Sequence, residues 1–334
     1  MSGPLRIGIL GAARITGGAL VEPARETGDR LVAVAARDRS RAEAFAAEHG
    51  VERVVGSYAD VLADPEVEIV YNPLANALHG PWNLAAVEAG KHVLSEKPFA
   101  GNAAEAREVR DAAAAAGVVV LEAFHHVHHP VLRRLHELVA SGELGALRRV
   151  EARFTMPAPP DDDPRWRLDL AGGALMDLGC YPLRCLRSFA ERVGGEPSVV
   201  SATADERAGH PGVDERVTAQ LAFPSGATGE AHCDMASDDW SITCRVVGED
   251  GEATAMNVVL PQRDDRIVVH GPDGERTEHL GTRSTYLYQL EAVRAHLHDG
   301  APFPAGADDA VATAELIDAV YTAAGLPVRP SMSR

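Results

Sequence analysis

The chain has 334 residues, of which 46% are hydrophobic and 24% charged, so it is long enough for two packed domains and too apolar to be disordered. Its 49 acidic side chains outnumber 32 basic ones and give a formal charge of −17, which argues against nucleic acid or an anionic membrane as a partner. Apolar runs are too short for a membrane span or a signal-peptide core, and we therefore expect a cytoplasmic protein.

Strand-like and helix-like segments alternate through residues 1–124. Short apolar, β-prone runs predict strands at 5–10, 31–35, 53–55, 68–72, 92–95 and 118–123. Helical patterns lie between them at 39–49, 59–62, 80–89 and 103–116. Strict alternation predicts an α/β fold, a Rossmann-type doubly wound parallel sheet with helices on both faces.

Residues 125–334 show a different pattern, which begins with a predicted helix at 130–141. Longer β-prone runs follow at 148–155, 199–205, 217–223, 228–233, 242–247 and 266–270, and a last helix is predicted at 308–324. Turns such as Pro224-Ser225-Gly226 join neighbouring strands into antiparallel pairs. We expect a C-terminal α+β domain with a large, mostly antiparallel open sheet.

The first strand-to-helix turn is the expected position of a phosphate-binding loop. It reads Gly11-Ala12-Ala13-Arg14-Ile15-Thr16, so only the first glycine of a G-x-G-x-x-G pattern is kept. Alanine is small enough for backbone amides to approach a pyrophosphate. The βαβ context favours a nucleotide site over an ordinary turn.

The end of the second strand discriminates between the two nicotinamide cofactors. An NAD site usually places an acidic residue there to bind the ribose 2′-hydroxyl, whereas this chain has Ala35-Ala36-Arg37. The Arg37 guanidinium, with Arg41 as a helper, would instead bind a 2′-phosphate. NADP(H) is therefore predicted over NAD(H); the alternative is that Asp38 supplies the acid one residue later.

A candidate catalytic group combines two distant segments. Lys97, one of only two lysines, follows the predicted strand at 92–95 in Glu96-Lys97-Pro98. Asp177 and Tyr181 lie four residues apart and share a face if their segment is helical. Carbonyl reduction needs a proton donor, and a tyrosine hydroxyl beside an ammonium becomes a usable acid.

These motifs together resemble the Gfo/Idh/MocA family of oxidoreductases over essentially the whole chain. The resemblance rests on six segments of the sequence. They are the turn at 8–15, the segments 35–38 and 76–79, Glu96-Lys97-Pro98, Trp166-Arg167, and the G-G-x-x-x-D-x-G-x-Y motif at 172–181. The family motif most often ends in His, and Tyr181 resembles the branch with dihydrodiol dehydrogenase, NADP-dependent xylose dehydrogenase and some sugar 3-ketoreductases.

The resemblance implies a function and roles for individual residues. It implies an NADP(H)-dependent oxidoreductase that moves hydride between nicotinamide and a secondary alcohol or carbonyl of a sugar, polyol or cyclic diol. Lys97 and Tyr181 would form the catalytic pair, and Asp177 would contact substrate. Cofactor contacts are expected at Gly11, Ala12, Ala13, Arg14, Ile15, Arg37, Arg41, Leu74, Asn76, His79, Glu96, Lys97, Trp166, Arg167 and Tyr288.

The same resemblance assigns 1–124 to cofactor binding and 125–334 to substrate binding and assembly into a homodimer or homotetramer. Two alternatives stay open: a reductase of nucleotide-linked 3-ketosugars, and a non-catalytic NADP-sensing regulator. Retention of both Lys97 and Tyr181 speaks against the regulator.

Four histidines, His125, His126, His128 and His129, invite a metal interpretation. No cysteine or carboxylate is tied to them by sequence, so no metal site is predicted. A cleft-lining or helix-capping role is preferred, with His129-Pro130 at the start of a helix.

Overall fold

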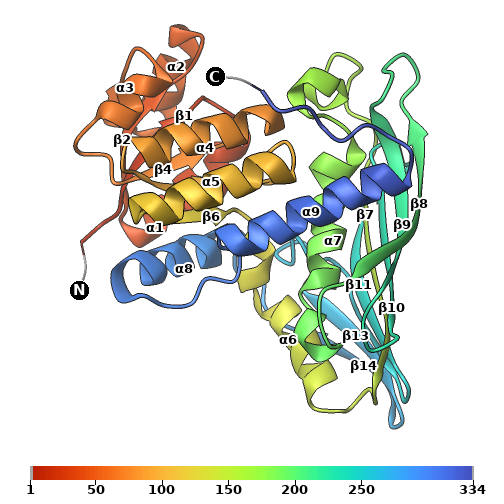
Figure 1. Cartoon of the computed structure of the whole chain (residues 1–334). Helices are drawn as coiled ribbons and strands as arrows, with labels where there is room; N and C mark the ends of the chain where they lie inside the picture. The colour runs from red at the N-terminus through yellow and green to blue at the C-terminus, as the bar shows by residue number, and fades with distance from the viewer. Residues whose placement is uncertain (1–2, 333–334) are drawn as a thin grey trace. The chain divides into compact units, whose positions relative to one another are not determined.

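The computed structural model describes residues 3–332, which divide into two compact units (Figure 1). The first unit contains the chain up to Phe124, Tyr286–Ala312 and the residues from Ser331 onward. The second contains His125–Thr285 and Thr313–Pro330. The chain thus returns to the first unit after leaving it, and helix α9 (Ala307–Ala323) contributes to both units.

A six-stranded parallel sheet forms the centre of the first unit. Its strand order is β3-β2-β1-β4-β5-β6, the order of a Rossmann dinucleotide-binding fold. The strands are β1 (Arg6–Leu10), β2 (Arg30–Ala35), β3 (Arg53–Val54), β4 (Ile69–Asn72), β5 (His92–Ser95) and β6 (Val120–Glu122). The connecting helices are η1 (Gly17–Val21), α1 (Glu22–Thr27), α2 (Arg39–His49), α3 (Tyr58–Ala63), η2 (Asn76–Leu78), α4 (His79–Glu88) and α5 (Ala103–Ala116).

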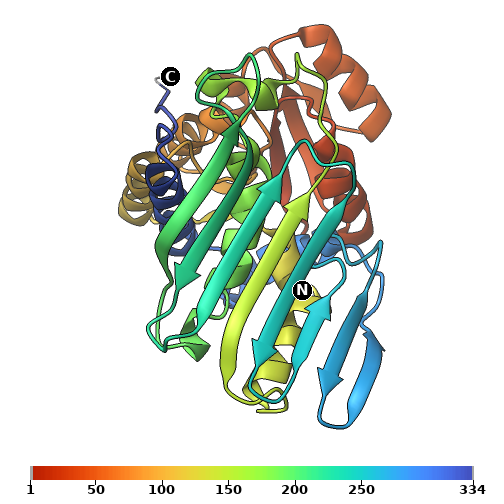
Figure 2. The ribbon, with the colours of Figure 1, turned by 90° about the vertical axis from the view of Figure 1, so that its right-hand side faces the viewer.

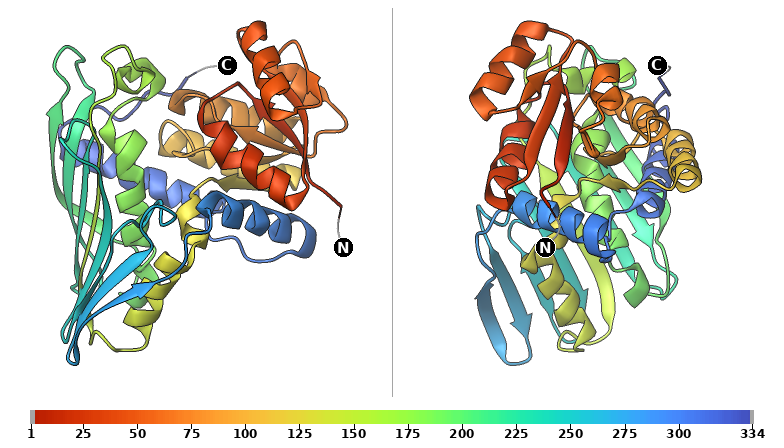
Figure 3. Two further views of the ribbon diagram at one scale, coloured as in Figure 1. Left: turned by 180° about the vertical axis from the view of Figure 1, so that it is seen from behind. Right: turned by 90° about the vertical axis from the view of Figure 1, so that its left-hand side faces the viewer.

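The central strands are buried on both faces, as their apolar runs require. All four residues of β4 and all but the first of β1 are buried. Helix α8 (Thr285–Asp299) adds Leu290 and Val293 to the apolar cluster that holds β1 and α1. In Figure 3 the blue α8 runs beside the red α1.

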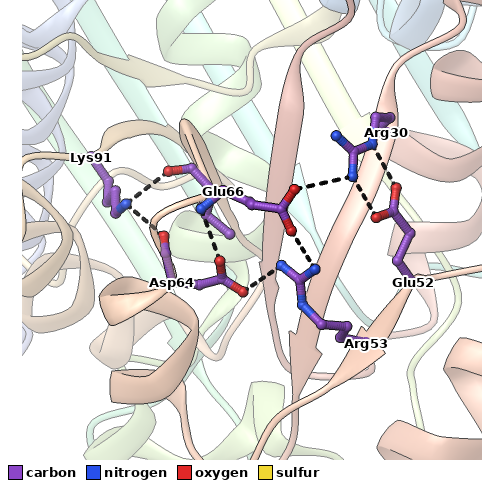
Figure 4. Close-up of polar contacts among 7 residues, drawn as sticks. Arg30, Glu52, Arg53, Asp64, Glu66 and Lys91 are labelled. Carbon is purple, nitrogen blue, oxygen red and sulfur yellow. Dashed lines mark hydrogen bonds and ion pairs between the residues drawn. The ribbon is translucent and has the colours of Figure 1, made fainter.

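Charged side chains brace the amino ends of the parallel strands (Figure 4). Arg53 pairs with Asp64 at 2.7 Å and also with Glu66. Lys91, which precedes β5, donates from Nζ to the carbonyls of Asp64 and Val67, both at 2.8 Å. An ammonium with three donors suits this junction, and it lies at the end of the sheet opposite to the usual ligand edge.

An eight-stranded sheet dominates the second unit, in the order β14-β13-β12-β11-β7-β10-β9-β8. Every neighbouring pair is antiparallel except β7 with β10. The strands are β7 (Leu147–Thr155), β8 (Ser198–Glu206), β9 (Asp214–Ala222), β10 (Thr228–Asp234), β11 (Ser241–Gly248), β12 (Glu252–Ala255), β13 (Arg266–Gly271) and β14 (Gly274–His279).

Helices cover one face of this sheet. Helix α6 (Pro130–Ala140) packs on β11 and β12, and α7 (Cys180–Arg187) packs on β7 and β10. Figure 2 looks onto the other face, where the strands carry no helix. Shorter helical segments are η3 (His125–His128), η4 (Pro164–Trp166), η5 (Leu168–Leu170), η6 (Leu175–Gly179) and η7 (Ala190–Arg192).

The predicted fold class is confirmed in both sheets. The sequence pattern missed β12 and β14 because β12 has only four residues and β14 is a polar, largely exposed edge strand. It also missed α8, whose apolar positions are too evenly spread to form a clear stripe. Among residues 3–332, no helix is both long and apolar enough to cross a membrane.

Candidate functional site

The turn after β1 presents a small-residue surface at the carboxyl edge of the parallel sheet. Gly11 has φ of +90°, a conformation that favours glycine. Its amide donates to the carbonyl of Ala35 at 2.7 Å, which ties the turn to the end of β2. Ala12 and Ala13 are half-buried, and Arg14 and Ile15 are exposed. This turn fits a pyrophosphate at the start of a helix.

The end of β2 carries exposed arginines and a carboxylate that is engaged in capping a helix. The Asp38 side chain caps α2 by accepting from the Ser40 amide at 2.9 Å and the Ser40 hydroxyl at 2.7 Å. These hydrogen bonds lower the pKa of Asp38. Arg41 donates to the carbonyl of Ala12 at 3.2 Å, and Arg37 is exposed. The surface fits a 2′-phosphate better than a bare 2′-hydroxyl.

The loop after β4 is held by a buried histidine. The Nε2 atom of His79 lies 2.8 Å from the Leu74 carbonyl, and its Nδ1 atom lies 2.6 Å from the Pro98 carbonyl. Burial lowers the pKa of His79 to about 4. The ring thus connects the predicted cofactor loop at 74–79 to the Glu96-Lys97-Pro98 segment. A cofactor contact by His79, Leu74 or Asn76 stays a prediction.

The Glu96-Lys97-Pro98 segment follows β5 at the same edge. Glu96 is buried and accepts from the Tyr71 hydroxyl at 2.7 Å. The Phe99 amide donates to Glu122 at 2.8 Å. Lys97 is half-buried between these anchored neighbours, which places its ammonium at the ligand edge of the sheet.

In the second unit, a buried ion pair supports the glycine-rich motif at 172–181. Asp214 and Arg329 are paired and fully buried. Asp214 also accepts from the Leu175 amide at 2.6 Å and the Tyr321 hydroxyl at 3.0 Å. Arg329 donates to the carbonyls of Gly172 at 2.7 Å and Gly212 at 2.9 Å. This cluster holds the entry into η6.

Gly173 at this entry leaves no room for a side chain. Its φ is +126°, and a Cβ atom would clash with the Asp214 carboxylate and the Arg329 guanidinium. The segment from Leu175 to Arg187 is helical, first as η6 and then as α7, so Asp177 and Tyr181 lie on one continuous helical segment as predicted.

Asp177 is paired with an arginine that the sequence did not single out as its partner. Arg165 Nη1 lies 3.5 Å from Asp177 Oδ2. Arg165 also forms two hydrogen bonds to Asp163, at 3.0 and 3.1 Å. Asp163 is therefore part of this cluster. The direct role of Asp177 toward substrate stays a prediction.

Tyr181 lies in the first turn of α7 beside two of the four clustered histidines, His125 and His126. Its hydroxyl is 3.3 Å from His125 Nε2, and His125 Nδ1 is 2.8 Å from Thr285 Oγ1. All three residues are buried. His129 caps α6 by accepting from the Val131 amide at 3.2 Å. The expected capping role is thus confirmed for His129.

The remaining predicted cofactor residues are dispersed. Trp166 is buried in the second unit, where its indole donates to the Pro159 carbonyl at 3.3 Å. Arg167 is exposed and pairs with Asp169. Tyr288 lies half-buried on α8 in the first unit. Their contacts to a cofactor stay predictions.

Comparison with known proteins decides the family. Residues 5–124 match an oxidoreductase family with an NAD-binding Rossmann fold, and residues 132–254 match the GFO/IDH/MocA C-terminal domain. The chain belongs to the Gfo/Idh/MocA family. This confirms the resemblance drawn from Lys97, Asp177 and Tyr181 and makes the chain a member of a family of oxidoreductases.

Several Gfo/Idh/MocA relatives match nearly the whole chain. A D-xylose 1-dehydrogenase (NADP+) from Haloferax volcanii is 34% identical, covering 96% of this chain and 97% of the relative. A dTDP-3,4-didehydro-2,6-dideoxy-α-D-glucose 3-reductase from Streptomyces violaceoruber is 35% identical, covering 96% of both chains. The crystal structure of a 3-ketoreductase from Actinomadura kijaniata with NADP and TDP-benzene matches with a TM-score of 0.88 at 29% identity, covering 96% of this chain and 98% of that chain.

Proposed function

We propose that this protein is an NADP(H)-dependent oxidoreductase acting on a secondary alcohol or carbonyl of a sugar, polyol or cyclic diol. The observation that carries the proposal is the presence of both Lys97 and Tyr181 in a chain similar over almost its full length to sugar oxidoreductases. When bound, the cofactor supplies or accepts the hydride. The protein supplies the proton and the binding surfaces.

Three side chains are assigned the chemistry. Tyr181 exchanges a proton with the substrate oxygen, and Lys97 is its electrostatic partner. Asp177 anchors a substrate hydroxyl beside Arg165, which lies 3.5 Å away and also pairs with Asp163. This cluster favours polyhydroxy substrates, because it offers both carboxylate acceptors and guanidinium donors to hydroxyl groups.

NADP(H) is preferred at the end of β2. Asp38 is engaged in capping α2, so it is poorly available to a ribose 2′-hydroxyl. Arg37 and Arg41 leave guanidinium groups at the same position. The NADP named for the xylose dehydrogenase and bound to the ketoreductase supports this choice.

The test is reduction of NADP+ and NAD+, followed at 340 nm, across aldoses, inositols and cyclic diols. Turnover should favour NADP+ and should fall by orders of magnitude in Lys97→Met while NADP+ binding is retained. If the protein binds NADPH tightly but turns over neither free nor nucleotide-linked sugars in either direction, the assignment as an enzyme is contradicted. That result would favour a cofactor-sensing regulator.

A reductase of nucleotide-linked 3-ketosugars is the second candidate. It is favoured by the 35% identity to the dTDP-sugar 3-reductase and by the structural match to the 3-ketoreductase. Oxidation of NADPH by a dTDP-linked ketosugar, with no turnover of free aldoses, would select it. Assembly into a homodimer or homotetramer through the uncovered face of the eight-stranded sheet is proposed as well, and sedimentation would measure it.

A further inference from the structure

Tyr181 is in contact with a buried histidine, His125, to which the proposed mechanism assigns no role. The Tyr181 hydroxyl lies 3.3 Å from His125 Nε2, and the rings meet edge to face with centroids 6.0 Å apart. Both side chains are buried in the second unit. A tyrosine that passes a proton to or from substrate needs a second group to exchange that proton with.

The other ring nitrogen of His125 determines the direction of this contact. His125 Nδ1 lies 2.8 Å from Thr285 Oγ1, and that hydroxyl donates to Gln262 Oε1 at 3.5 Å. A threonine hydroxyl has one proton, so with that proton directed at Gln262 its oxygen accepts from His125 Nδ1–H. Neutral His125 then has an unprotonated Nε2 that accepts from the Tyr181 hydroxyl.

We propose that His125 is a positioning residue that exchanges the reaction's proton with Tyr181, an inference that rests on the proposed function. In the oxidation direction the substrate O–H bond breaks and its proton bonds to Tyr181 Oη, while the phenolic proton moves from Oη to His125 Nε2. The substrate's hydride leaves with the cofactor. His125 becomes an imidazolium, and the proton returns through Tyr181 to water after product release. Reduction runs through the same steps in reverse.

This arrangement gives Tyr181 an imidazole nitrogen as its proton acceptor. A neutral imidazole nitrogen is an ordinary acceptor of a proton in general acid–base catalysis. Two titratable side chains are in ring contact with His125. Tyr181 of α7 has its ring centroid 6.0 Å away, and His126 of the same turn has its ring centroid 6.1 Å away. Arg184 of α7 acts electrostatically on His126, whose pKa is lowered well below its usual value by burial. The geometry distinguishes the two rings, because the Tyr181 hydroxyl lies 3.3 Å from His125 Nε2.

The first measurement is made on the protein without added cofactor or substrate. Long-range proton–nitrogen correlation spectra of ¹⁵N-histidine-labelled protein at pH 7 report which nitrogen of each ring is protonated, and His125→Gln assigns the His125 signals. We expect a protonated Nδ1 and an unprotonated Nε2 whose chemical shift changes in Tyr181→Phe. A protonated Nε2 in the neutral ring would overturn the proposal.

The second measurement separates proton exchange from a purely structural role. In His125→Gln the amide oxygen still accepts from Tyr181 but takes up no proton. We expect kcat to fall about 100-fold, KM and NADP+ affinity to stay within threefold, and kcat to rise with pH as hydroxide replaces the histidine. A kcat within threefold of wild type would refute the relay.

His136→Gln is the matched control, because His136 is a half-buried histidine of the second unit and packs against Phe189 with ring centroids 4.3 Å apart. Its kcat should match wild type. If the wild-type protein turns over no substrate, the proposed function fails, and the spectra still decide the direction of the hydrogen bond. The two failures are therefore distinguishable.

Discussion

Gly173→Ala should be one of the most destabilising single-methyl substitutions in the second unit. The added Cβ would overlap the Asp214 carboxylate and the Arg329 guanidinium, both of which are fully buried. Relief of the overlap requires the ion pair to separate where no water replaces its contacts. The backbone must also keep φ at +126° with a side chain present.

The expected magnitude follows from these two costs. Breaking a buried ion pair costs about 3–5 kcal/mol, and a left-handed conformation in a residue with a Cβ costs about 1–2 kcal/mol. Partial relaxation reduces the sum, so we expect the free energy of unfolding to fall by about 4 kcal/mol. Such a loss is a large fraction of the stability of an ordinary domain.

Gly209→Ala is the matched control for the backbone cost. Gly209 has φ of +81° in the same unit, and a Cβ there would meet no atom within 4 Å. Urea unfolding followed by circular dichroism should give a loss of about 1 kcal/mol for Gly209→Ala and a much larger loss for Gly173→Ala. Equal losses would refute the steric argument. If Gly173→Ala is not recovered folded, Arg329→Lys provides the test, because it keeps the charge and loses the fork that reaches Gly172 and Gly212.

Three further predictions concern the cofactor, the pH dependence of stability and the amino edge of the parallel sheet. Arg37→Glu should weaken NADP+ binding at least tenfold in fluorescence titration and change NAD+ binding less than threefold, since only NADP+ carries the 2′-phosphate. Burial lowers the pKa of His79, His128 and His136 from 6.5 to about 4. The unfolded chain therefore takes up these protons first, and the free energy of unfolding should decrease as pH falls from about 6.5 to about 4, by up to about 1.4 kcal/mol per pH unit for each histidine; a flat profile in urea titrations over this range would contradict it. Lys91→Met should lower the free energy of unfolding by about 1–3 kcal/mol, because it removes the ammonium that donates to two backbone carbonyls. NADP+ binding should stay unchanged. A parallel loss of NADP+ binding would contradict the assignment of Lys91 to the edge of the sheet opposite the cofactor.

Local patterns were sufficient for the parallel sheet and for the position of its ligand edge. Apolar runs alternating with helical patterns predicted six strands, because residues buried on both faces of a parallel sheet are continuously apolar. Gly11, Arg37 and Lys97 each lie within two residues of the end of a strand, so all three lie at the carboxyl edge of the parallel sheet. The combination of Glu96-Lys97-Pro98 with Tyr181 also indicated the family from the sequence.

The partners of the site residues were decided by tertiary structure. Position 173 requires glycine because the Asp214 carboxylate and the Arg329 guanidinium occupy the space that a Cβ atom would need. Arg329 is 156 residues away along the chain. Tyr181 meets His125 only because α7 and the turn at 125–128 pack together in the second unit. Periodicity reports which face of a segment is buried. It does not report which side chain from another segment meets that face, and the folded chain alone determines these pairings.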